Sequence, residues 1–250
     1  MFRVVIPARY GSTRLPGKPL RVLAGRTLLE HVYRGALASG AEEVRIATDD
    51  ERIVAACVRF GVQAAMTAAS HASGTDRIAE LVAREGWPEE DVVVNVQGDE
   101  PLLPATLVRQ VAELLDSQGS AGIATLATPI ESLEEFLDPN VVKVAVGRTG
   151  LALYFSRAPI PWSRDGAPHG LASQTHFSGA LRHLGLYAYR VGVLKRLTAL
   201  SPSALEQAER LEQLRALDNG IAIAVGLARE RPGPGVDTEE DLAAVARRLG

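Results

Sequence analysis

Residues 4–20 read VVIPARYGSTRLPGKPL, in which a short β-branched run leads directly into a loop rich in glycine, proline and positive charge. Glycine lets a backbone come close to a ligand, and proline stiffens a loop. The cationic side chains of this loop are Arg9, Arg14 and Lys18. A strand that ends in such a loop predicts a clamp for phosphate groups, and the alternative is a surface loop that is merely basic.

Two familiar phosphate-binding loops do not fit this stretch. A P-loop needs GxxxxGK[ST], but five residues separate Gly11 from Gly17, and Pro19 replaces the hydroxyl residue that would bind Mg²⁺. The dinucleotide fingerprint GxGxxG follows no strand-like segment, since residues 233–235 lack the third glycine. The sequence therefore argues against a P-loop kinase and against an NAD-dependent enzyme.

Composition and charge narrow the class of protein. The chain has 250 residues, 46% of them hydrophobic and 23% charged, with a formal net charge of -3. These values are ordinary for a globular protein and give no support to binding of nucleic acid or of a membrane surface, which need a basic face. No segment approaches the ~18 apolar residues of a membrane helix, and the apolar run 4–6 stops at Pro7 instead of continuing as a signal peptide. We therefore expect a cytoplasmic protein without membrane insertion or nucleic-acid binding.

Segments with strand and helix patterns alternate through the first half of the chain. This alternation is typical of βαβ units in a mostly parallel sheet with helices on both faces. The single cysteine, Cys57, lies in one of the helix-like runs among apolar residues, where we expect a buried thiol without a catalytic role. Strands are predicted at residues 2–6, 43–48, 62–66 and 91–96, and helices at 27–39, 50–60, 75–85 and 104–116.

The second half of the chain has closer-spaced strands, which predicts antiparallel pairs in that part of the sheet. Its one long loop is 161–180, and a loop of that length is typical of a lid, an interface element or a disordered segment. Strands are predicted at 122–128, 141–147, 151–156, 181–190 and 221–227, and helices at 192–199, 203–217 and 238–249.

Two acidic segments could complete a phosphate site. The segment QGD at 97–99 follows a predicted strand, at the carboxyl end where ligands bind in open α/β sheets. A second carboxylate, Asp237, precedes residues 238–241, whose spacing is typical of a helix cap. Carboxylates beside a phosphate clamp are the usual ligands of Mg²⁺, with substrate phosphates in the rest of its shell. The alternative for Asp99 is that it caps the helix that follows.

The strand at 181–190 suggests a small binding site. Side chains alternate between the two faces of a strand, so His183, Gly185 and Tyr187 share the face opposite the core. Because Gly185 has no side chain, His183 and Tyr187 would flank an open spot roughly 13 Å long. A small ligand could occupy that spot, although a lone histidine on a strand is usually structural.

Polar residues elsewhere give further candidates. The segment SGTDR at 73–77 puts hydroxyls and an arginine at a helix start, suited to a base or ribose or simply to capping the helix. Glu212 and Arg215 project into the apolar stripe of the helix 203–217, which is costly unless they pair with each other or meet a ligand. Arg157 follows a predicted strand and suits an anionic substrate, but it could as easily be a surface arginine.

Seven motifs, in order along nearly the full length, resemble one family. Together they are similar to the 3-deoxy-manno-octulosonate cytidylyltransferases, which make CMP-Kdo for lipopolysaccharide synthesis, where Kdo is 3-deoxy-D-manno-octulosonate. Seven collinear motifs are far more specific than any one of them. The motifs are IPARYGSTRLPGKPL, SGTDR, VNVQGDEP, ALYFSRAPIPW, RHLGLYAYR, LEQLR and PGPGVDTEEDL.

The resemblance implies a Rossmann-like nucleotidyltransferase fold, an α/β fold in keeping with the strand and helix pattern, and a homodimer. It also implies a single domain over 1–250, with a nucleotide-binding half at about 1–120 and a sugar-binding and dimerisation half at about 121–250. The catalytic residues would be Arg9, Lys18, Asp99 and Asp237, the last two binding Mg²⁺. The nucleotide would contact Arg9, Lys18, Ser73, Arg77 and Gly98, and the sugar would contact Gln97, Arg157, His183, Tyr187, Glu212 and Gln213.

The implied reaction joins CTP and Kdo to give CMP-Kdo and pyrophosphate. In-line attack of the anomeric 2-hydroxyl of Kdo on the α-phosphorus would need no protein nucleophile, and positioning and charge stabilisation would supply most of the rate. Three alternatives stay open. They are an enzyme for another acid sugar, such as sialic acid or an amino analogue of Kdo, a glycosyltransferase, which would more often carry a DxD pair, and a nucleotide sensor without turnover.

Overall fold

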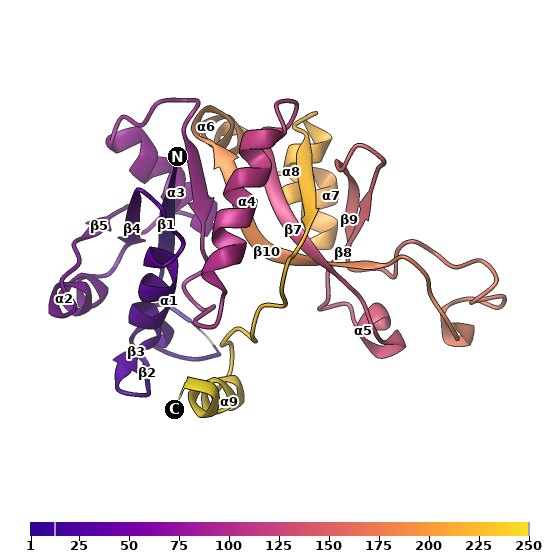
Figure 1. The fold of residues 1–250 in the computed structure, drawn as a ribbon, viewed down its shortest axis with the longest axis horizontal. Coiled ribbons are helices and arrows are strands. Elements are labelled where there is room, and N and C mark those ends of the chain that lie inside the picture. The colour runs from indigo at the N-terminus through magenta and orange to yellow at the C-terminus, as the bar shows by residue number, and fades with distance from the viewer. Residues whose placement is uncertain (13, 250) are drawn as a thin grey trace.

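The computed structural model describes residues 1–12 and 14–249, and a mixed sheet of nine strands forms the centre of this described part (Figure 1). Four strands from the first half are parallel to one another. They lie in the order β5 (Ala64–Met66), β4 (Glu43–Thr48), β1 (Phe2–Ala8) and β6 (Val92–Asn95). β-branched side chains fill β1 and β6, as expected for strands that are covered on both faces.

The second half adds the antiparallel part of the sheet. The long strand β10 (Leu181–Arg190) runs antiparallel to both β6 and β7 (Ile123–Pro129), and β11 (Ile223–Leu227) is parallel to β7 at the edge. A hairpin of β8 (Lys143–Val146) and β9 (Ala152–Ser156) extends the sheet from the start of β10. The predicted fold class, a mostly parallel sheet with an antiparallel second half, is confirmed.

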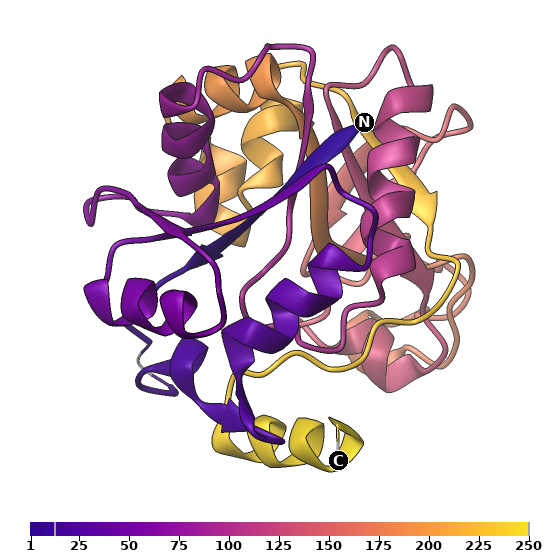
Figure 2. The ribbon, with the colours of Figure 1, turned by 60° about the vertical axis from the view of Figure 1, so that its left-hand side comes forward.

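Helices cover both faces of the sheet, as predicted (Figure 2). One layer holds α1 (Leu28–Leu37), α2 (Glu51–Arg59) and α4 (Ala105–Ser117), and the other holds α3 (Gly74–Arg84), α6 (Val191–Ala199) and α8 (Gln213–Asp218). Cys57 in α2 is fully buried, and burial raises the pKa of its thiol to about 11, in keeping with the predicted structural role. Within the residues described, no helix has both the length and the apolar character needed to cross a membrane.

A small separate core joins the two ends of the chain. The last helix, α9 (Glu239–Leu249), packs on the hairpin of β2 (Val22–Leu23) and β3 (Arg26–Thr27), below the main sheet in Figure 1. Leu15 of the N-terminal loop and Val236, which precedes α9, are almost fully buried in this core. Apolar packing therefore brings the segment around Asp237 up to the loop predicted to bind phosphate.

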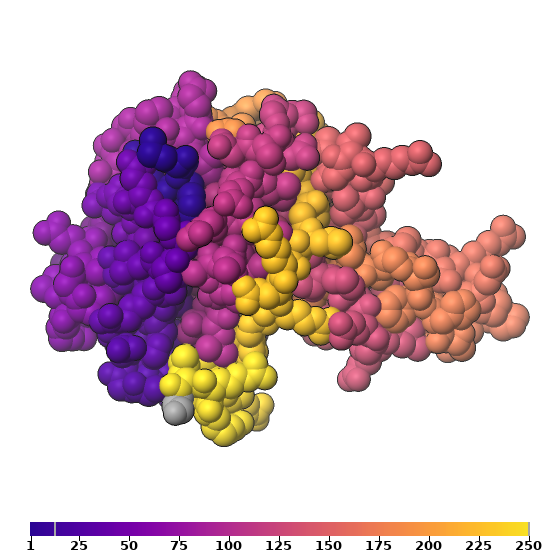
Figure 3. Space-filling model, viewed as in Figure 1, coloured from indigo at the N-terminus to yellow at the C-terminus, as the bar shows by residue number. Residues whose placement is uncertain are grey.

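The loop 161–180 projects from one side of the molecule (Figure 3). It contains the short 3-10 turn η2 (Leu171–Ser173), and Phe177 near its end stacks on Phe136 of α5 (Leu133–Leu137), with ring centroids 4.8 Å apart. Trp162 and Leu171 in the loop are largely exposed. The loop is thus anchored near Phe177 and presents apolar side chains to solvent.

The helix predicted at 203–217 is wrong, because the structure divides it into two. α7 (Ala204–Glu209) ends at Arg210, whose backbone is left-handed with a φ of 54°, and α8 begins three residues later. The alternative in which Glu212 pairs with Arg215 is also wrong. Arg215 donates to both carboxylate oxygens of Glu206, at 2.8 and 2.5 Å, and both side chains are mostly buried. Because Arg215 pairs with Glu206 instead, Glu212 does not pair with Arg215.

We expect Arg215→Ala to lower the free energy of unfolding by about 3 kcal/mol, because a mostly buried carboxylate would lose its partner. Arg182→Ala is a matched control, since the Arg182–Glu135 pair joins two other elements but leaves the arginine half exposed. The control should cost about 0.5 kcal/mol or less. Urea unfolding followed by circular dichroism measures both, and equal losses would contradict the pairing described for α7 and α8.

Candidate active site

The ammonium group of Lys18 joins three segments that are far apart in the sequence. Lys18 begins the 3-10 turn η1 (Lys18–Leu20), at the end of the N-terminal loop. Its Nζ donates to Oδ2 of Asp99 at 2.6 Å, to Oδ1 of Asp237 at 2.9 Å and to the carbonyl of Val236 at 3.1 Å. All three of its N–H bonds are used, and the two predicted metal ligands converge on one cation.

The two acidic segments differ in whether they cap a helix. Asp99 does not cap α4, which starts without a side-chain cap bond, so its carboxylate serves the site instead. The cap predicted at 238–241 is confirmed. Asp241 accepts from the backbone N–H groups of Asp237 and Thr238, and its own N–H donates to Oγ1 of Thr238. This cap orients Asp237 and leaves its carboxylate directed at the ammonium group.

The carboxylates of Asp99 and Asp237 form a site whose charge suits a cation. Burial alone would lower the pKa of Lys18, but the charges and hydrogen bonds of Asp99 and Asp237 outweigh it and raise that pKa. Throughout residues 1–12 and 14–249, no group of three or more His, Cys, Asp or Glu side chains gathers at one point. A metal ion here would therefore take two carboxylates from the protein and further oxygens from a substrate. Mg²⁺ is commonly held in this way, so the donor set fits it.

Lys18, Asp99 and Asp237 line a cavity of about 420 Å³, here called the clamp cavity. Arg9 and Arg14 add positive charge to its wall, and Nη2 of Arg14 lies 3.1 Å from Oδ2 of Asp237. The walls of the clamp cavity approach one another closely at Pro7. A Cβ atom at Gly74 or Gly98 would lie only 3.0 Å from atoms of Pro7, so a larger residue at either position would require Pro7 to shift.

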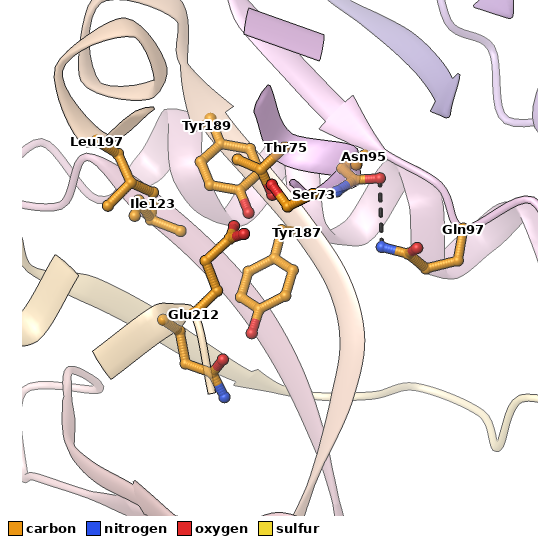
Figure 4. Close-up of a pocket in the computed structure, with 11 residues that line it drawn as sticks. Ser73, Thr75, Asn95, Gln97, Ile123, Tyr187, Tyr189, Leu197 and Glu212 are labelled. Carbon is orange, nitrogen blue, oxygen red and sulfur yellow. Dashed lines mark hydrogen bonds between the residues drawn. The ribbon is translucent and has the colours of Figure 1, made fainter. Parts of the chain in front are cut away.

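A second cavity of about 210 Å³, here called the inner cavity, adjoins the clamp cavity and shares Gly74 and Gln97 with it. The inner cavity lies at the carboxyl end of β6, between α3 and α8 (Figure 4). Four predicted site residues besides Gln97 line it, namely Ser73, Tyr187, Glu212 and Gln213. Ser73 also caps α3 through a reciprocal bond with Asp76, so the capping interpretation is confirmed, while contact of this segment with a nucleotide stays a prediction.

The two tyrosines of the inner cavity, Tyr187 and Tyr189, resist deprotonation. The Glu212 carboxylate points toward the Tyr189 hydroxyl (Figure 4). Burial, followed by the charge of Glu212, raises the pKa of Tyr189, and burial raises the pKa of Tyr187 well above its usual value. Both phenols therefore stay protonated, and can donate to or accept from a hydroxyl-rich ligand.

Several residues of the inner cavity were not predicted as site residues. Asn95 was the only polar residue in a β-branched strand, and that could have marked it, while Thr75 lay within the quoted segment at a helix start. Tyr189 shares the strand face of Tyr187, so strand alternation could have found it as well. Ile123 and Leu197 are apolar and look like any core residue, so no sequence signal set them apart.

Three predicted site residues lie outside both cavities, namely Arg77, Arg157 and His183. The Arg77 side chain is fully buried, where it donates to Asp49 at 2.6 Å and to the hydroxyl of Thr67, so direct contact with a ligand in either cavity is not supported. Arg157 is held by main-chain groups. Its Nε donates to the carbonyl of Glu209 at 2.7 Å and its Nη1 to that of Pro139 at 3.0 Å. These contacts place Arg157 at the base of the β8–β9 hairpin.

The open spot predicted between His183 and Tyr187 is wrong. Leu184 pairs with Leu126 but Tyr187 pairs with the preceding residue of β7, so residues 185–186 form a bulge in β10. The bulge brings the rings of His183 and Tyr187 together, with centroids 5.2 Å apart. His183 therefore touches Tyr187, a wall residue of the inner cavity, but itself lines a third cavity together with Gly185.

Comparison with known proteins agrees with this geometry. The cytidylyltransferase family model matches residues 3–223. Two curated relatives are the 3-deoxy-manno-octulosonate cytidylyltransferases of Halorhodospira halophila, 55% identical over 99% of this chain and 96% of the relative, and of Thioalkalivibrio sulfidiphilus, 54% identical over 99% and 98%. A solved CMP:2-keto-3-deoxy-manno-octonic acid synthetase in complex with CTP superposes with a TM-score of 0.88 at 41% identity, covering 100% of this chain and 98% of that one.

The resemblance drawn from the seven motifs is thereby confirmed, since identity above half extends over nearly the whole of the chain and of its relatives. The fold, the paired cavities and the relatives lead to the same assignment. The chain is a nucleotidyltransferase of the cytidylyltransferase family and belongs to its 3-deoxy-manno-octulosonate cytidylyltransferases.

Proposed function

We propose that this chain transfers CMP from CTP to the anomeric 2-hydroxyl of Kdo, giving CMP-Kdo and pyrophosphate. The observation that carries the proposal is the pair of adjoining cavities, which share Gly74 and Gln97. One has cationic walls suited to a triphosphate, and the other has hydroxyl and amide groups suited to a sugar. The site would bring the two substrates together at their shared wall.

In the clamp cavity, Lys18 and Arg9 would hold the phosphates of CTP. Arg9 is exposed at the rim, and Lys18 would give up a carboxylate partner to reach a phosphate oxygen. The loop at Gly98 allows close backbone approach, and Ser73 at the start of α3 places a helix N-terminus near the nucleotide. Arg77 would contribute indirectly, by holding Asp49 and Thr67 behind this wall.

Asp99 and Asp237 would hold Mg²⁺, whose bound charge would polarise the α-phosphate and lower the pKa of the attacking hydroxyl. The step would form a bond between the 2-oxygen of the sugar and the α-phosphorus. It would break the bond between the α-phosphorus and the oxygen that bridges the α- and β-phosphates. The bridging oxygen leaves with pyrophosphate, and the hydroxyl proton passes to solvent water. Lys18 and Arg9 would neutralise the charge that develops on the departing group. No protein nucleophile is needed, and alignment of the substrates supplies much of the rate.

The sugar would lie in the inner cavity, against Gln97, Tyr187, Glu212 and Gln213, with His183 beside it. Related acid sugars, such as sialic acid or an amino analogue of Kdo, are the alternative substrates, because the same polar groups could bind any of them. We also propose a cytoplasmic homodimer. Largely exposed apolar side chains at Leu153, Trp162 and Leu171, on and beside the projecting loop, support a partner surface there.

The test of this function is pyrophosphate release with Mg²⁺ and Kdo, comparing CTP, UTP, ATP and GTP with a control lacking sugar. We expect release with CTP that depends on Kdo. Release only with a different acid sugar would keep the chemistry and change the substrate. Binding of CTP without release in any mixture would overturn the enzymatic proposal and favour a sensor.

Replacing the carboxylate of Asp99 or of Asp237 should abolish most of the turnover. We expect Asp99→Asn and Asp237→Asn each to lower kcat by about 10²-fold or more, because transition-state charge would lose its metal-based stabilisation. Glu240→Gln is a matched control, since that carboxylate is exposed three residues beyond Asp237. Near-normal kcat for the two asparagine variants at saturating Mg²⁺, with the fold intact by circular dichroism, would refute the metal assignment.

A further inference from the structure

Thr125 in β7 contacts the bulge of β10 through its hydroxyl group. The residue is fully buried. Its Oγ1 lies 2.8 Å from the carbonyl oxygen of Leu186, 3.1 Å from that of Leu184 and 3.0 Å from Nε2 of His183. A hydroxyl group has one proton to donate, whereas carbonyl oxygens can only accept. The proton of Thr125 must therefore go to the bulge, most directly to Leu186.

This proton count determines the tautomer of His183. If Nε2 carried no hydrogen, its lone pair would face a lone pair of Oγ1 at 3.0 Å, in a place where Thr125 excludes water. Nε2 therefore carries the hydrogen and donates it to Thr125. Burial lowers the pKa of His183 to about 3, so the ring is neutral near pH 7. A neutral imidazole has a single N–H, which leaves a lone pair on Nδ1.

The lone pair on Nδ1 has no partner within the described residues. Among the described residues, the hydrogen bond of the His183 side chain is made by Nε2. Nδ1 has no partner there and keeps some exposed surface. The ring packs between Phe155, edge-on at 5.0 Å, and Tyr187, tilted at 5.2 Å. Because Tyr187 lines the inner cavity and His183 itself lines the third cavity, the open acceptor lies between these two cavities.

We infer that Thr125 is a positioning residue that holds His183 with its hydrogen on Nε2, so that Nδ1 accepts a hydrogen bond from a hydroxyl group of the sugar acid. His183 then does not pair with the sugar carboxylate, because a neutral acceptor repels a carboxylate oxygen. The identity of the ligand rests on the proposed function, whereas the tautomer does not. The consequence is selection for a hydroxyl at one position of the sugar.

The tautomer is measured directly by two-dimensional ¹H–¹⁵N NMR of the imidazole groups in protein labelled at its five histidines. His183→Gln identifies the signals of His183 by their loss. We expect a pyrrole-type shift for Nε2 and a pyridine-type shift for Nδ1 in the wild type. Thr125→Ser should keep this pattern, and Thr125→Val, which keeps the shape but removes the hydroxyl, should lose it. A wild-type His183 that carries hydrogen on Nδ1, or on both nitrogens, would overturn the inference.

Steady-state kinetics then tests the effect on substrate. We expect Thr125→Val to raise KM for Kdo about tenfold, the size of one lost hydrogen bond, with KM for CTP changed less than roughly twofold. Thr125→Ser should restore the wild-type KM. Equal losses in both variants, or a rise in KM for CTP as large as that for Kdo, would contradict the positioning role. If Kdo is not turned over by the wild type, the proposed function fails, while the NMR result still decides the tautomer.

Discussion

A single ammonium group, that of Lys18, connects the parts of this protein on which the site depends. It bridges the carboxylates of Asp99 and Asp237, which come from the middle and the end of the chain. The small apolar core that includes Leu15 and Val236 keeps the same segments together from below. A cation flanked by two carboxylates is stable only while they stay close, so the clamp cavity requires the C-terminal segment as much as the N-terminal loop.

An exchange of cations at this point would let the same residues serve both the structure and the proposed catalysis. Without substrate, the two carboxylates need a positive partner, and Lys18 supplies it. With CTP bound, phosphate oxygens would attract the ammonium group, and Mg²⁺ would take its place between the carboxylates. Each cation then keeps an anionic partner throughout, so substrate binding leaves no buried charge unpaired. The inner cavity contributes differently, through protonated tyrosines suited to hydroxyl groups, and a neutral histidine lies beside it.

Much of this arrangement could be predicted from the sequence, because local patterns determine it. Alternating strands and helices predicted the parallel half, and the rule that ligands bind at the carboxyl ends of strands placed Asp99 beside the N-terminal loop. The errors arose where distant residues decide the outcome. Arg215 pairs with Glu206 across a left-handed break, Arg77 pairs with Asp49, and the bulge at 185–186 accepts a hydrogen bond from Thr125 of another strand. Neither residue spacing nor helical periodicity contains these partners.

The most direct test of the account is a crystal structure with CTP and Mg²⁺ bound. The account predicts a metal ion in contact with Asp99 and Asp237, and the Nζ of Lys18 moved from at least one of those carboxylates to a phosphate oxygen. A structure in which CTP is bound while Lys18 still bridges both carboxylates, with the metal ion elsewhere, would contradict it.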